Sequence, residues 1–219
     1  MIPNFQHKKI LITAGPTYEP IDPVRFIGNR STGKMGIAIA DAFAEQQADV
    51  TLILGPTTNR PKNKNITTIC VETADEMYAA CLKYEANSNI IIMSAAVADY
   101  KVKHVATQKI KKSEESIQLE LIKNVDILFE LGKIKTHQLL VGFALETENV
   151  LENAKAKLKK KNLDLIIANT TNQNGEGFGF DTNKISIVDK DNKIYNFELK
   201  QKQELAVDIC NVIATYLNR

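Results

Sequence analysis

Cysteine and histidine are scarce in this chain of 219 residues, and neither type is clustered. The sequence holds three of each, widely separated: Cys70, Cys81, Cys210, His7, His104 and His137. The cysteines share no metal-ligand spacing and each falls in an apolar segment, so we predict buried, reduced thiols. No cluster of His, Cys and carboxylates indicates zinc. No Ser/His/Asp or Cys/His arrangement indicates hydrolysis through a covalent enzyme intermediate.

Long apolar runs and strong net charge are also missing. No apolar run approaches the ~20 residues of a membrane span, and no signal peptide precedes the first predicted strand. The net charge of +2 provides no global field that would attract nucleic acid. With 44% apolar and 25% charged residues, the composition is that of a globular protein. We therefore expect a cytoplasmic protein with one domain over residues 1–219 and no membrane or nucleic-acid partner.

The most informative stretch is GNRSTGKMG at residues 28–36. Its glycines permit close backbone approach, and we predict that Ser31 or Thr32 caps a helix running to about Gln47. Free N–H groups at a helix start, with Lys34 beside them, favour a phosphate or carboxylate ligand. The match to the Walker A pattern is incomplete because Met35 replaces the Ser or Thr that would bind Mg²⁺. A capped helix start without a ligand remains the alternative.

Apolar strand-like segments alternate with amphipathic helical ones, which predicts an α/β fold with a Rossmann-like, doubly wound and mostly parallel sheet. The expected parallel strands are residues 9–13, 49–55, 66–71, 89–94, 139–147 and 163–170. Thr73 and Thr147 are predicted to cap the second and fourth helices. Three prolines hold residues 16–23 extended, residues 116–124 alternate as an antiparallel strand, and residues 184–199 form a small antiparallel hairpin near the C-terminus.

Ligands of such sheets bind beyond the carboxyl ends of the strands. Residues 13–15, residues 94–99 and the loop at residues 28–36 are therefore expected to converge. Asp99 is either a ligand to ribose, metal or backbone, or a simple strand-end cap. The lysine-rich residues 100–115 form either a flap or a solvated loop. Lys157 and Lys161 are neighbours on one helix face, and either form a solvated surface or reach phosphates.

This inventory of lysines, backbone donors and one aspartate favours phosphoryl or nucleotidyl transfer, which depends on positioning and charge neutralisation. Seven motifs occur in order: ILITAGPTYEPIDPVRFIGNRSTGKMG, SAAVADYK, KIKK, KNVDIL, VGFALET, KNLDLIIAN and GFGFDTN. Together, over roughly residues 8–218, the chain resembles bacterial phosphopantothenoylcysteine synthetase (phosphopantothenate–cysteine ligase) of coenzyme A biosynthesis.

The resemblance implies a ligase that joins 4′-phosphopantothenate to L-cysteine. The substrate carboxylate would attack the α-phosphate of CTP, giving an acyl-cytidylate and pyrophosphate, and the cysteine amine would then displace CMP. Mg²⁺ would bridge the triphosphate. The family is dimeric, so a homodimer is expected. In many bacteria a flavin-dependent decarboxylase domain precedes this one. That domain is absent here, so the chain is expected to be a stand-alone ligase or an excised domain, with a separate decarboxylase as a possible partner.

The resemblance also assigns residues to the site. Nucleotide-binding residues would be Met93, Ser94, Ala95, Asp99, Lys109, Val125, Asp126, Ile127, Leu128, Phe143, Lys157 and Lys161. Arg25 and Asn29 would hold the acyl intermediate, with Asn29 important in the cysteine step, and Lys109 would stabilise charge as the acyl-cytidylate forms. The family usually has proline where Val125 stands, so we expect a looser loop there. No residue is assigned to the metal.

Two other functions stay open. A nucleotide-dependent reductase of the Rossmann class would need the G-x-G-x-x-G fingerprint and an acidic residue after the second strand, where this chain has Gly55-Pro56. A non-catalytic nucleotide-binding module would bind without turnover. The choice of CTP over ATP comes from the resemblance alone.

Overall fold

An eight-stranded sheet forms the centre of the described part of the chain. The structure, a computed structural model, describes residues 5–111, 116–146, 148–170 and 179–219. The strand order is β12-β11-β10-β9-β6-β1-β4-β5. The bounds are β1 Lys9–Ala14, β4 Asp49–Leu54, β5 Thr67–Cys70, β6 Ile90–Met93, β9 Leu139–Glu146, β10 Leu165–Thr170, β11 Thr182–Asp189 and β12 Ile194–Gln201. All pairings from β5 to β10 are parallel, and β11 and β12 add an antiparallel hairpin at one edge. The predicted Rossmann-like sheet and hairpin are confirmed.

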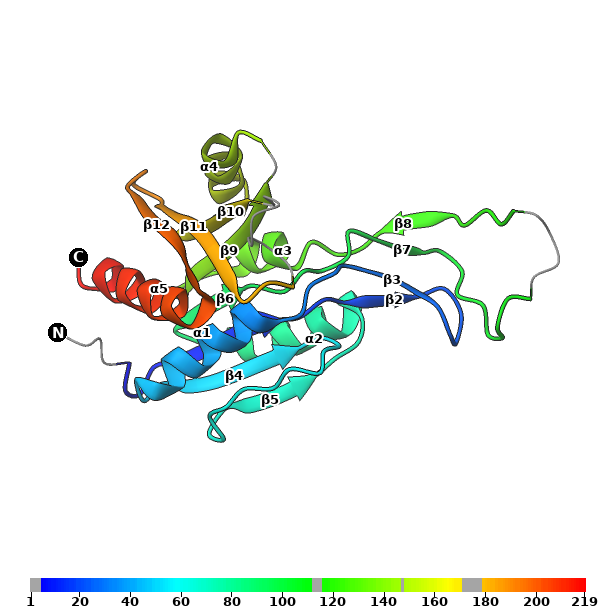
Figure 1. Ribbon diagram of the computed structural model, residues 1–219, viewed down its shortest axis with the longest axis horizontal. Coiled ribbons are helices and arrows are strands. Elements are labelled where there is room, and N and C mark those ends of the chain that lie inside the picture. The colour runs from blue at the N-terminus through cyan, green and yellow to red at the C-terminus, as the bar shows by residue number, and fades with distance from the viewer. Residues whose placement is uncertain (1–4, 112–115, 147, 171–178) are drawn as a thin grey trace.

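Helices cover both faces of this sheet (Figure 1). They are α1 Lys34–Glu45, α2 Ala74–Glu85, α3 Ile127–Ile134, α4 Val150–Lys160 and α5 Lys202–Leu217. Because successive strand side chains point to opposite faces, Ile10 and Ile12 of β1 join the core with α1 and α5. Leu11, between them, joins the core with α2, α3 and α4. The near-continuous apolar strands of the sequence are therefore buried on both sides.

The direction of winding reverses at β1, which lies between β4 and β6. The chain beyond these strands is joined by backbone hydrogen bonds: Ser94 N–H donates to Thr13 O at 3.2 Å, and Ala96 N–H to Gly15 O at 2.8 Å. The Thr13 hydroxyl also accepts from Ala95 N–H at 3.2 Å. The expected meeting of residues 13–15 with residues 94–99 is confirmed, at the place where open α/β sheets bind ligands.

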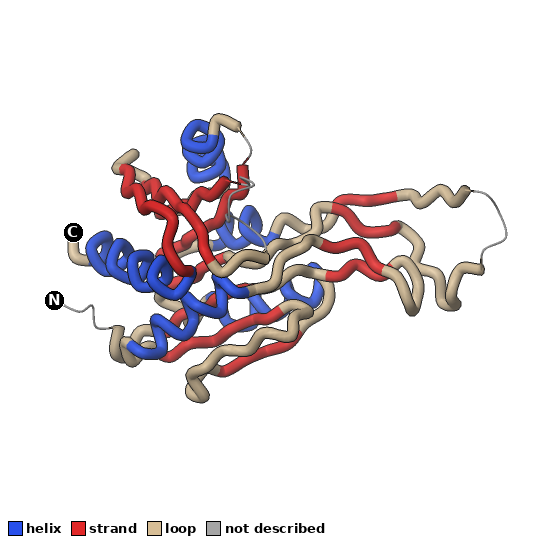
Figure 2. The backbone as a smooth tube through the Cα atoms, in the orientation of Figure 1, coloured by secondary structure: helices blue, strands red, loops and turns tan. Residues whose placement is uncertain are grey.

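A slender arm extends away from the sheet, as Figures 1 and 2 show. It consists of residues 18–28, 100–111 and 116–123, with the strands β2 Tyr18–Pro20, β3 Phe26–Gly28, β7 Tyr100–Val102 and β8 Leu121–Lys123. The strands pair antiparallel as β2–β3 and β7–β8. The proline-rich segment of residues 16–23 is a strand only over Tyr18–Pro20, because the chain bends at residues 21–24 to return as β3 in a hairpin.

The prediction of a strand over residues 116–124 was too long, because its partner β7 offers only three residues for pairing. The lysine-rich segment of residues 100–115 is not wholly a loop, since it begins with β7. Residues 112–115, in the middle of the expected flap, lie outside the described residues.

Three smaller predictions need correction. The N-cap of α1 is Gly33, without a side-chain cap, so neither Ser31 nor Thr32 caps the helix. Thr147 lies outside the described residues, and α4 begins after Asn149. Cys70 is exposed because β5 is an edge strand, whereas the other two cysteines are buried. By contrast, the predicted capping of α2 by Thr73 is confirmed, with a full capping box.

Candidate active site

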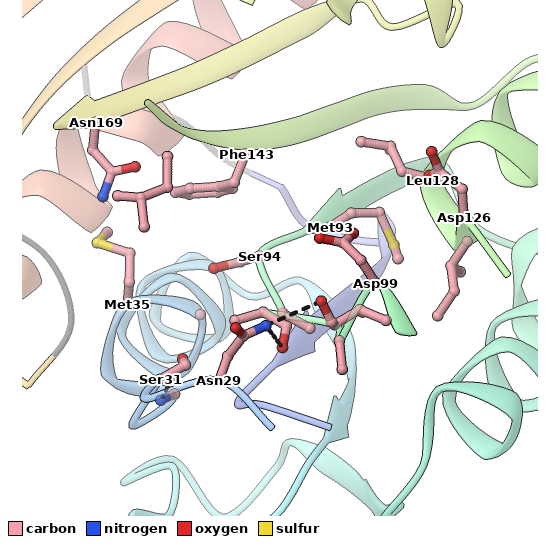
Figure 3. Close-up of a pocket in the computed structure, with 18 of the residues that line it drawn as sticks. Asn29, Ser31, Met35, Met93, Ser94, Asp99, Asp126, Leu128, Phe143 and Asn169 are labelled. Atoms are coloured by element: carbon pink, nitrogen blue, oxygen red, sulfur yellow. Dashed lines mark hydrogen bonds between the residues drawn. The ribbon is translucent and has the colours of Figure 1, made fainter. Parts of the chain in front are cut away.

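A cavity of about 370 Å³ opens toward the carboxyl ends of β6, β9 and β10 (Figure 3). Of the residues predicted for the site, those that line it are Asn29, Met93, Ser94, Ala95, Asp99, Val125, Asp126, Ile127, Leu128, Phe143, Lys157 and Lys161. They come from the end of β3, the segment after β6, the start of α3, β9 and α4. Residues far apart in sequence thus share one crevice because the parallel strands end at the same edge.

Arg25 and Lys109, also predicted for the site, do not line the cavity. Both lie in the arm. Arg25 Nη2 contacts Asp22 Oδ2 at 2.5 Å and donates to Ile110 O at 2.8 Å. Asp22, whose side chain is buried, also accepts from Ile110 N–H at 3.1 Å. The Asp22–Arg25 pair therefore ties the β2–β3 hairpin to the segment that carries the exposed Lys109.

The Arg25 guanidinium, helped by backbone N–H groups, holds the pKa of the Asp22 carboxyl well below its usual range. Asp22 is therefore ionised at every pH at which the arm is expected to act.

Asn29 directly follows β3, where the arm joins the sheet body, and its side chain is fixed by two hydrogen bonds from the amide nitrogen. Nδ2 donates to Ala96 O at 3.0 Å and to Val97 O at 3.1 Å, drawn as dashed lines in Figure 3. Both donor positions are used, so the amide oxygen is the group left to accept from a ligand. An acceptor held in this way suits a ligand that carries an N–H group.

The N-terminus of α1 approaches the end of β1 unusually closely. A Cβ added at Gly36 would lie 2.6 Å from the Ala14 Cβ, so only glycine fits. Gly33 enters the helix with φ of 75°, a conformation that favours glycine. The first turn of α1 has neither a side-chain cap nor an acidic residue. Its backbone N–H groups, on residues that line the cavity, keep their positive potential.

At another side of the cavity, α4 presents two lysines on one face. Lys157 and Lys161 both line the cavity, and Lys161 Nζ lies 2.8 Å from Asp126. The side chain of Lys161 is only 14% exposed, so the alternative of a solvated surface is wrong for it. Asp126 also accepts from Phe129 N–H at 3.1 Å, which confirms that α3 begins near Asp126.

Several residues that line the cavity were not assigned to it from the sequence: Asn124, Asn169, Asn183 and Lys202. Lys34 also lines it, as the anion site predicted at the start of the helix would require. Lys34 Nζ lies 2.6 Å from Asp181 Oδ1, and Lys202 Nζ donates to Phe180 O at 2.7 Å. Asn169 is the penultimate residue of β10 and Lys202 begins α5, so its place near a strand end was the available signal for Asn169, and none pointed to Lys202.

Oxygen ligands are present for a hard cation. Asp99 and Asp126 line the cavity, and Asn124 Oδ1 is buried without a hydrogen-bond partner among the described atoms. In the described part of the chain, no three His, Cys, Asp or Glu residues gather into a metal centre. Mg²⁺ usually binds through one or two carboxylates, water and substrate phosphates, so these residues fit it better than a metal held by protein alone.

Comparison with known proteins gives one consistent family. Residues 5–217 match the family described as DNA/pantothenate metabolism flavoprotein C-terminal domain. The chain is 50% identical over 211 residues to the coenzyme A biosynthesis bifunctional protein CoaBC of Haemophilus influenzae, covering 96% of this chain and 52% of that protein. It is 49% identical over 212 residues to a protein of an unknown prokaryotic organism named cysteine/cysteine sulfinic acid decarboxylase, covering 96% of this chain and 59% of that protein.

A solved structure agrees with these relatives. The crystal structure of the C-terminal domain of the coenzyme A biosynthesis bifunctional protein CoaBC superimposes with a TM-score of 0.83 at 41% identity. The match covers 98% of this chain and 97% of that one. Against the two full-length relatives, the chain spans only 52% and 59% of their length. None of the helices in the described residues is long and apolar enough to cross a membrane.

Proposed function

The chain belongs to the family of the DNA/pantothenate metabolism flavoprotein C-terminal domain, and on this premise we propose that it is a phosphopantothenate–cysteine ligase of coenzyme A biosynthesis. It joins 4′-phosphopantothenate to L-cysteine in the cytoplasm and uses CTP. The observation that carries the proposal is the single cavity lined by Asn29 and eleven of the predicted nucleotide-binding residues. The candidate partner implied by the resemblance is a separate phosphopantothenoylcysteine decarboxylase, and it is supported by a relative named as bifunctional, of which this chain spans 52%.

In the first step, the carboxylate of 4′-phosphopantothenate attacks the α-phosphate of CTP. A P–O bond forms to the carboxylate, the bond to the β-phosphate breaks, and pyrophosphate leaves. The protein supplies charge neutralisation rather than a nucleophile. Lys157 and Lys161 meet the triphosphate, Lys109 stabilises the charge that develops, and Phe143 flanks the base. Lys161 Nζ lies 2.8 Å from the Asp126 carboxylate. To meet the triphosphate, Lys161 must exchange this contact for one with the ligand.

In the second step, the cysteine amine attacks the acyl carbon, loses a proton and displaces CMP. The Asn29 amide is already fixed through Nδ2 to the carbonyls of Ala96 and Val97. Its oxygen is therefore available to accept from the attacking amine and to orient the nitrogen lone pair toward the acyl carbon. Rigid positioning of this kind is the main aid that a bimolecular aminolysis needs.

Mg²⁺, when bound with CTP, neutralises phosphate charge in this chemistry. Asp99 is the candidate ligand, because Asp126 already serves Lys161 and the start of α3. Asn124 offers an amide oxygen nearby in the chain fold, since its backbone N–H donates to Asp99 O at 2.9 Å. The carboxylate and the amide oxygen belong to the oxygen ligands that this ion prefers.

The arm supports the proposal of a homodimer. Large apolar side chains exposed on it are Val24, Phe26, Tyr100, Val105, Ile117, Leu119, Leu121 and Ile122. Many large apolar side chains exposed on one arm favour an interaction site there, and a second copy of the chain would cover them. Arg25 and Lys109 sit on the same arm, away from the cavity of their own chain, so we infer that they act at the cavity of the partner copy.

Mixing of inactive variants tests that inference. In a hybrid of Arg25→Ala and Asn29→Asp subunits, one of the two sites would have both residues intact. In an equal mixture half of the dimers are hybrids, and each hybrid has one intact site of its two. Activity per total protein should therefore return toward one quarter of the wild-type value. Failure to recover any activity, with hybrid dimers demonstrated by differential tags, would contradict action across the dimer.

The ligase itself is tested by pyrophosphate release. The protein is incubated with phosphopantothenate, cysteine, Mg²⁺ and either CTP or ATP, and each component is omitted in turn. We expect release with CTP that requires phosphopantothenate. Release with ATP alone would keep the ligase but overturn the nucleotide choice. Binding of nucleotide without release from either would indicate a non-catalytic module, and oxidation of a nicotinamide cofactor would indicate the reductase.

A further inference from the structure

The proposed ligase mechanism assigns no role to the lysine in the loop at residues 28–36. Lys34 lines the cavity, and its Nζ lies 2.6 Å from Asp181 Oδ1. Lys202, at the start of α5, lines the same cavity although the residue is only 5% exposed. Its backbone N–H donates to Asp181 O at 2.9 Å, and its Nζ donates to Phe180 O at 2.7 Å. Two ammonium groups therefore flank one short segment at the edge of the cavity.

Asp181 is held less firmly than Asp126, which also pairs with a lysine at the cavity. Its side chain is 70% exposed, and within the described residues its carboxylate accepts only from Lys34. Asp126, by comparison, contacts Lys161 and also caps α3 through Phe129 N–H. An exposed ion pair contributes little to stability, so Lys34 can leave Asp181 at small cost.

The electrostatics of this corner favour a further anion. Lys34 holds the pKa of Asp181 below its usual value, with Lys202 adding to the effect. Burial lowers the pKa of Lys202, and the nearby Lys34 lowers it further. Lys34 thus pairs with a weakly held carboxylate beside the cavity, and Lys202 lies near enough to both groups to act on them electrostatically. A phosphate group brings more negative charge than a carboxylate and three acceptor oxygens, so it would satisfy both lysines better.

We propose that Lys34 and Lys202 form a second phosphate-binding position in the cavity, and that the Asp181 carboxylate engages Lys34 until a phosphate displaces it. This position is separate from the pair Lys157 and Lys161 on α4. The inference rests on the proposed function, which supplies two phosphorylated ligands. The group bound here is a phosphate of the nucleotide or the terminal phosphate of 4′-phosphopantothenate.

The sign of one substitution separates this role from a structural one. Asp181→Asn removes the competitor but keeps the size of the side chain. We expect it to tighten binding of the phosphate ligand about threefold, measured by isothermal titration calorimetry at constant ionic strength. A residue that merely positions Lys34 would have the opposite effect. Lys34→Gln should weaken binding of the same ligand about tenfold, because a charge-assisted contact is lost.

Two controls test whether the change in affinity arises at Lys34 and not from the change in net charge. Glu198→Gln removes one carboxylate that lies 2.8 Å from Lys184, an exposed pair outside the cavity, and so matches the change of charge. It should leave affinity unchanged. In the Lys34→Gln background, Asp181→Asn should lose most of its benefit, because the residue acts through Lys34. Lys202→Gln adds a third measurement, with thermal unfolding to check folding, but Asp181→Asn and Lys34→Gln decide the outcome.

Three ligands distinguish the source of the phosphate: CTP with Mg²⁺, 4′-phosphopantothenate, and inorganic pyrophosphate. Tightening by Asp181→Asn for CTP and pyrophosphate assigns the position to the triphosphate, and tightening for phosphopantothenate alone assigns it to the acyl substrate. If wild-type protein binds the ligands and Asp181→Asn leaves every affinity unchanged or weaker, the second position is overturned while the ligase stands. If wild-type protein binds none of the three, the proposed function fails as well.

Discussion

In the sheet body apolar side chains are covered from both faces, whereas in the arm many of them face solvent. Ile12 in β1 and Ile92 in β6 have no exposed surface, while Leu121 in β8 is 45% exposed and Val24 is 59% exposed. The body needs no partner to bury its core. The arm, with strands of three residues, has little core of its own and gains most from being covered.

The same contrast divides the site. The body contributes the cavity and its fixed groups, such as Asn29 against the carbonyls after β6. The arm contributes Arg25 and the neighbourhood of Lys109, joined by the contact from Arg25 Nη2 to Ile110 O at 2.8 Å. Binding can thus be a property of the body alone, and turnover a property of body and arm together.

The largest effect is expected in the arm. Lys109→Gln should reduce pyrophosphate release by roughly 10²–10³, the usual cost of removing one charge-stabilising group in a transition state. Affinity for CTP should change much less, because Lys109 is assigned to the charge that develops in the transition state, whereas Lys157 and Lys161 are assigned to the triphosphate of the bound nucleotide. Rapid-quench assays of pyrophosphate, with CTP binding by calorimetry, measure the two quantities.

Asn29→Asp in the body is the counterpart. A carboxylate would be repelled by the carbonyls of Ala96 and Val97, which now accept from Asn29 Nδ2. We expect pyrophosphate release to continue and the cysteine-linked product to fall about 100-fold. The reverse pattern, with Lys109→Gln blocking only the cysteine step, would contradict both assigned roles.

The next effect lies in the body. Gly36→Ala should destabilise the protein by about 1–3 kcal/mol, because the new Cβ would lie 2.6 Å from the Ala14 Cβ. In an ordinary helix the same change is stabilising by up to about 1 kcal/mol, so the sign of the effect is diagnostic. Urea denaturation of both proteins measures it. A more stable variant would show that α1 does not need its close approach to β1.

A smaller effect is expected from charge on the arm surface. Leu121→Glu should weaken self-association at least about tenfold, while the free energy of unfolding of the sheet body stays unchanged. Leu199→Glu is the matched control, because Leu199 is 47% exposed on β12 in the body. Sedimentation equilibrium gives the dissociation constants. Equal weakening by both substitutions, or by neither, would contradict the assignment of the arm as the dimer surface.

The smallest effect concerns pH. Asp22 has a lowered pKa in the folded arm, so the stability it contributes is present above its unfolded pKa of about 4 and declines as pH falls below that value. Asp22→Asn should loosen the arm at pH 7, and its difference from wild type should shrink toward pH 3. Hydrogen exchange of amides in the β2–β3 hairpin reports both. A difference that is constant with pH would contradict the role of the carboxylate charge.

These regions also differ in how far the sequence predicted them. The parallel strands, the order of elements and the family are confirmed, because continuous apolar runs and strand-end motifs are strong local signals. The predicted start of α1 was wrong by two residues. The N-cap is Gly33, which has a left-handed conformation and no side-chain cap, so a search for a capping side chain could not locate it. The length of β8 depends on its partner β7, which is a tertiary property.

For the site, motif order correctly grouped the residues that line the cavity, yet their roles there stay predictions. Lys202 was missed because it is brought to the cavity by the packing of α5 beside α1, which no local pattern encodes. Arg25 and Lys109 were assigned to the site by their motifs, but they do not line the cavity of their own chain, and their roles stay predictions. Sequence motifs record shared function and do not record which chain supplies a residue.

The proposal that this protein is a two-step ligase is tested most directly by following pyrophosphate and CMP in one reaction. The protein is supplied with CTP, Mg²⁺ and 4′-phosphopantothenate, first without and then with L-cysteine. We predict a burst of pyrophosphate of about one per active site without cysteine, and then equal amounts of pyrophosphate, CMP and phosphopantothenoylcysteine once it is added. Absence of pyrophosphate, or CMP formed without the cysteine-linked product, would contradict the account.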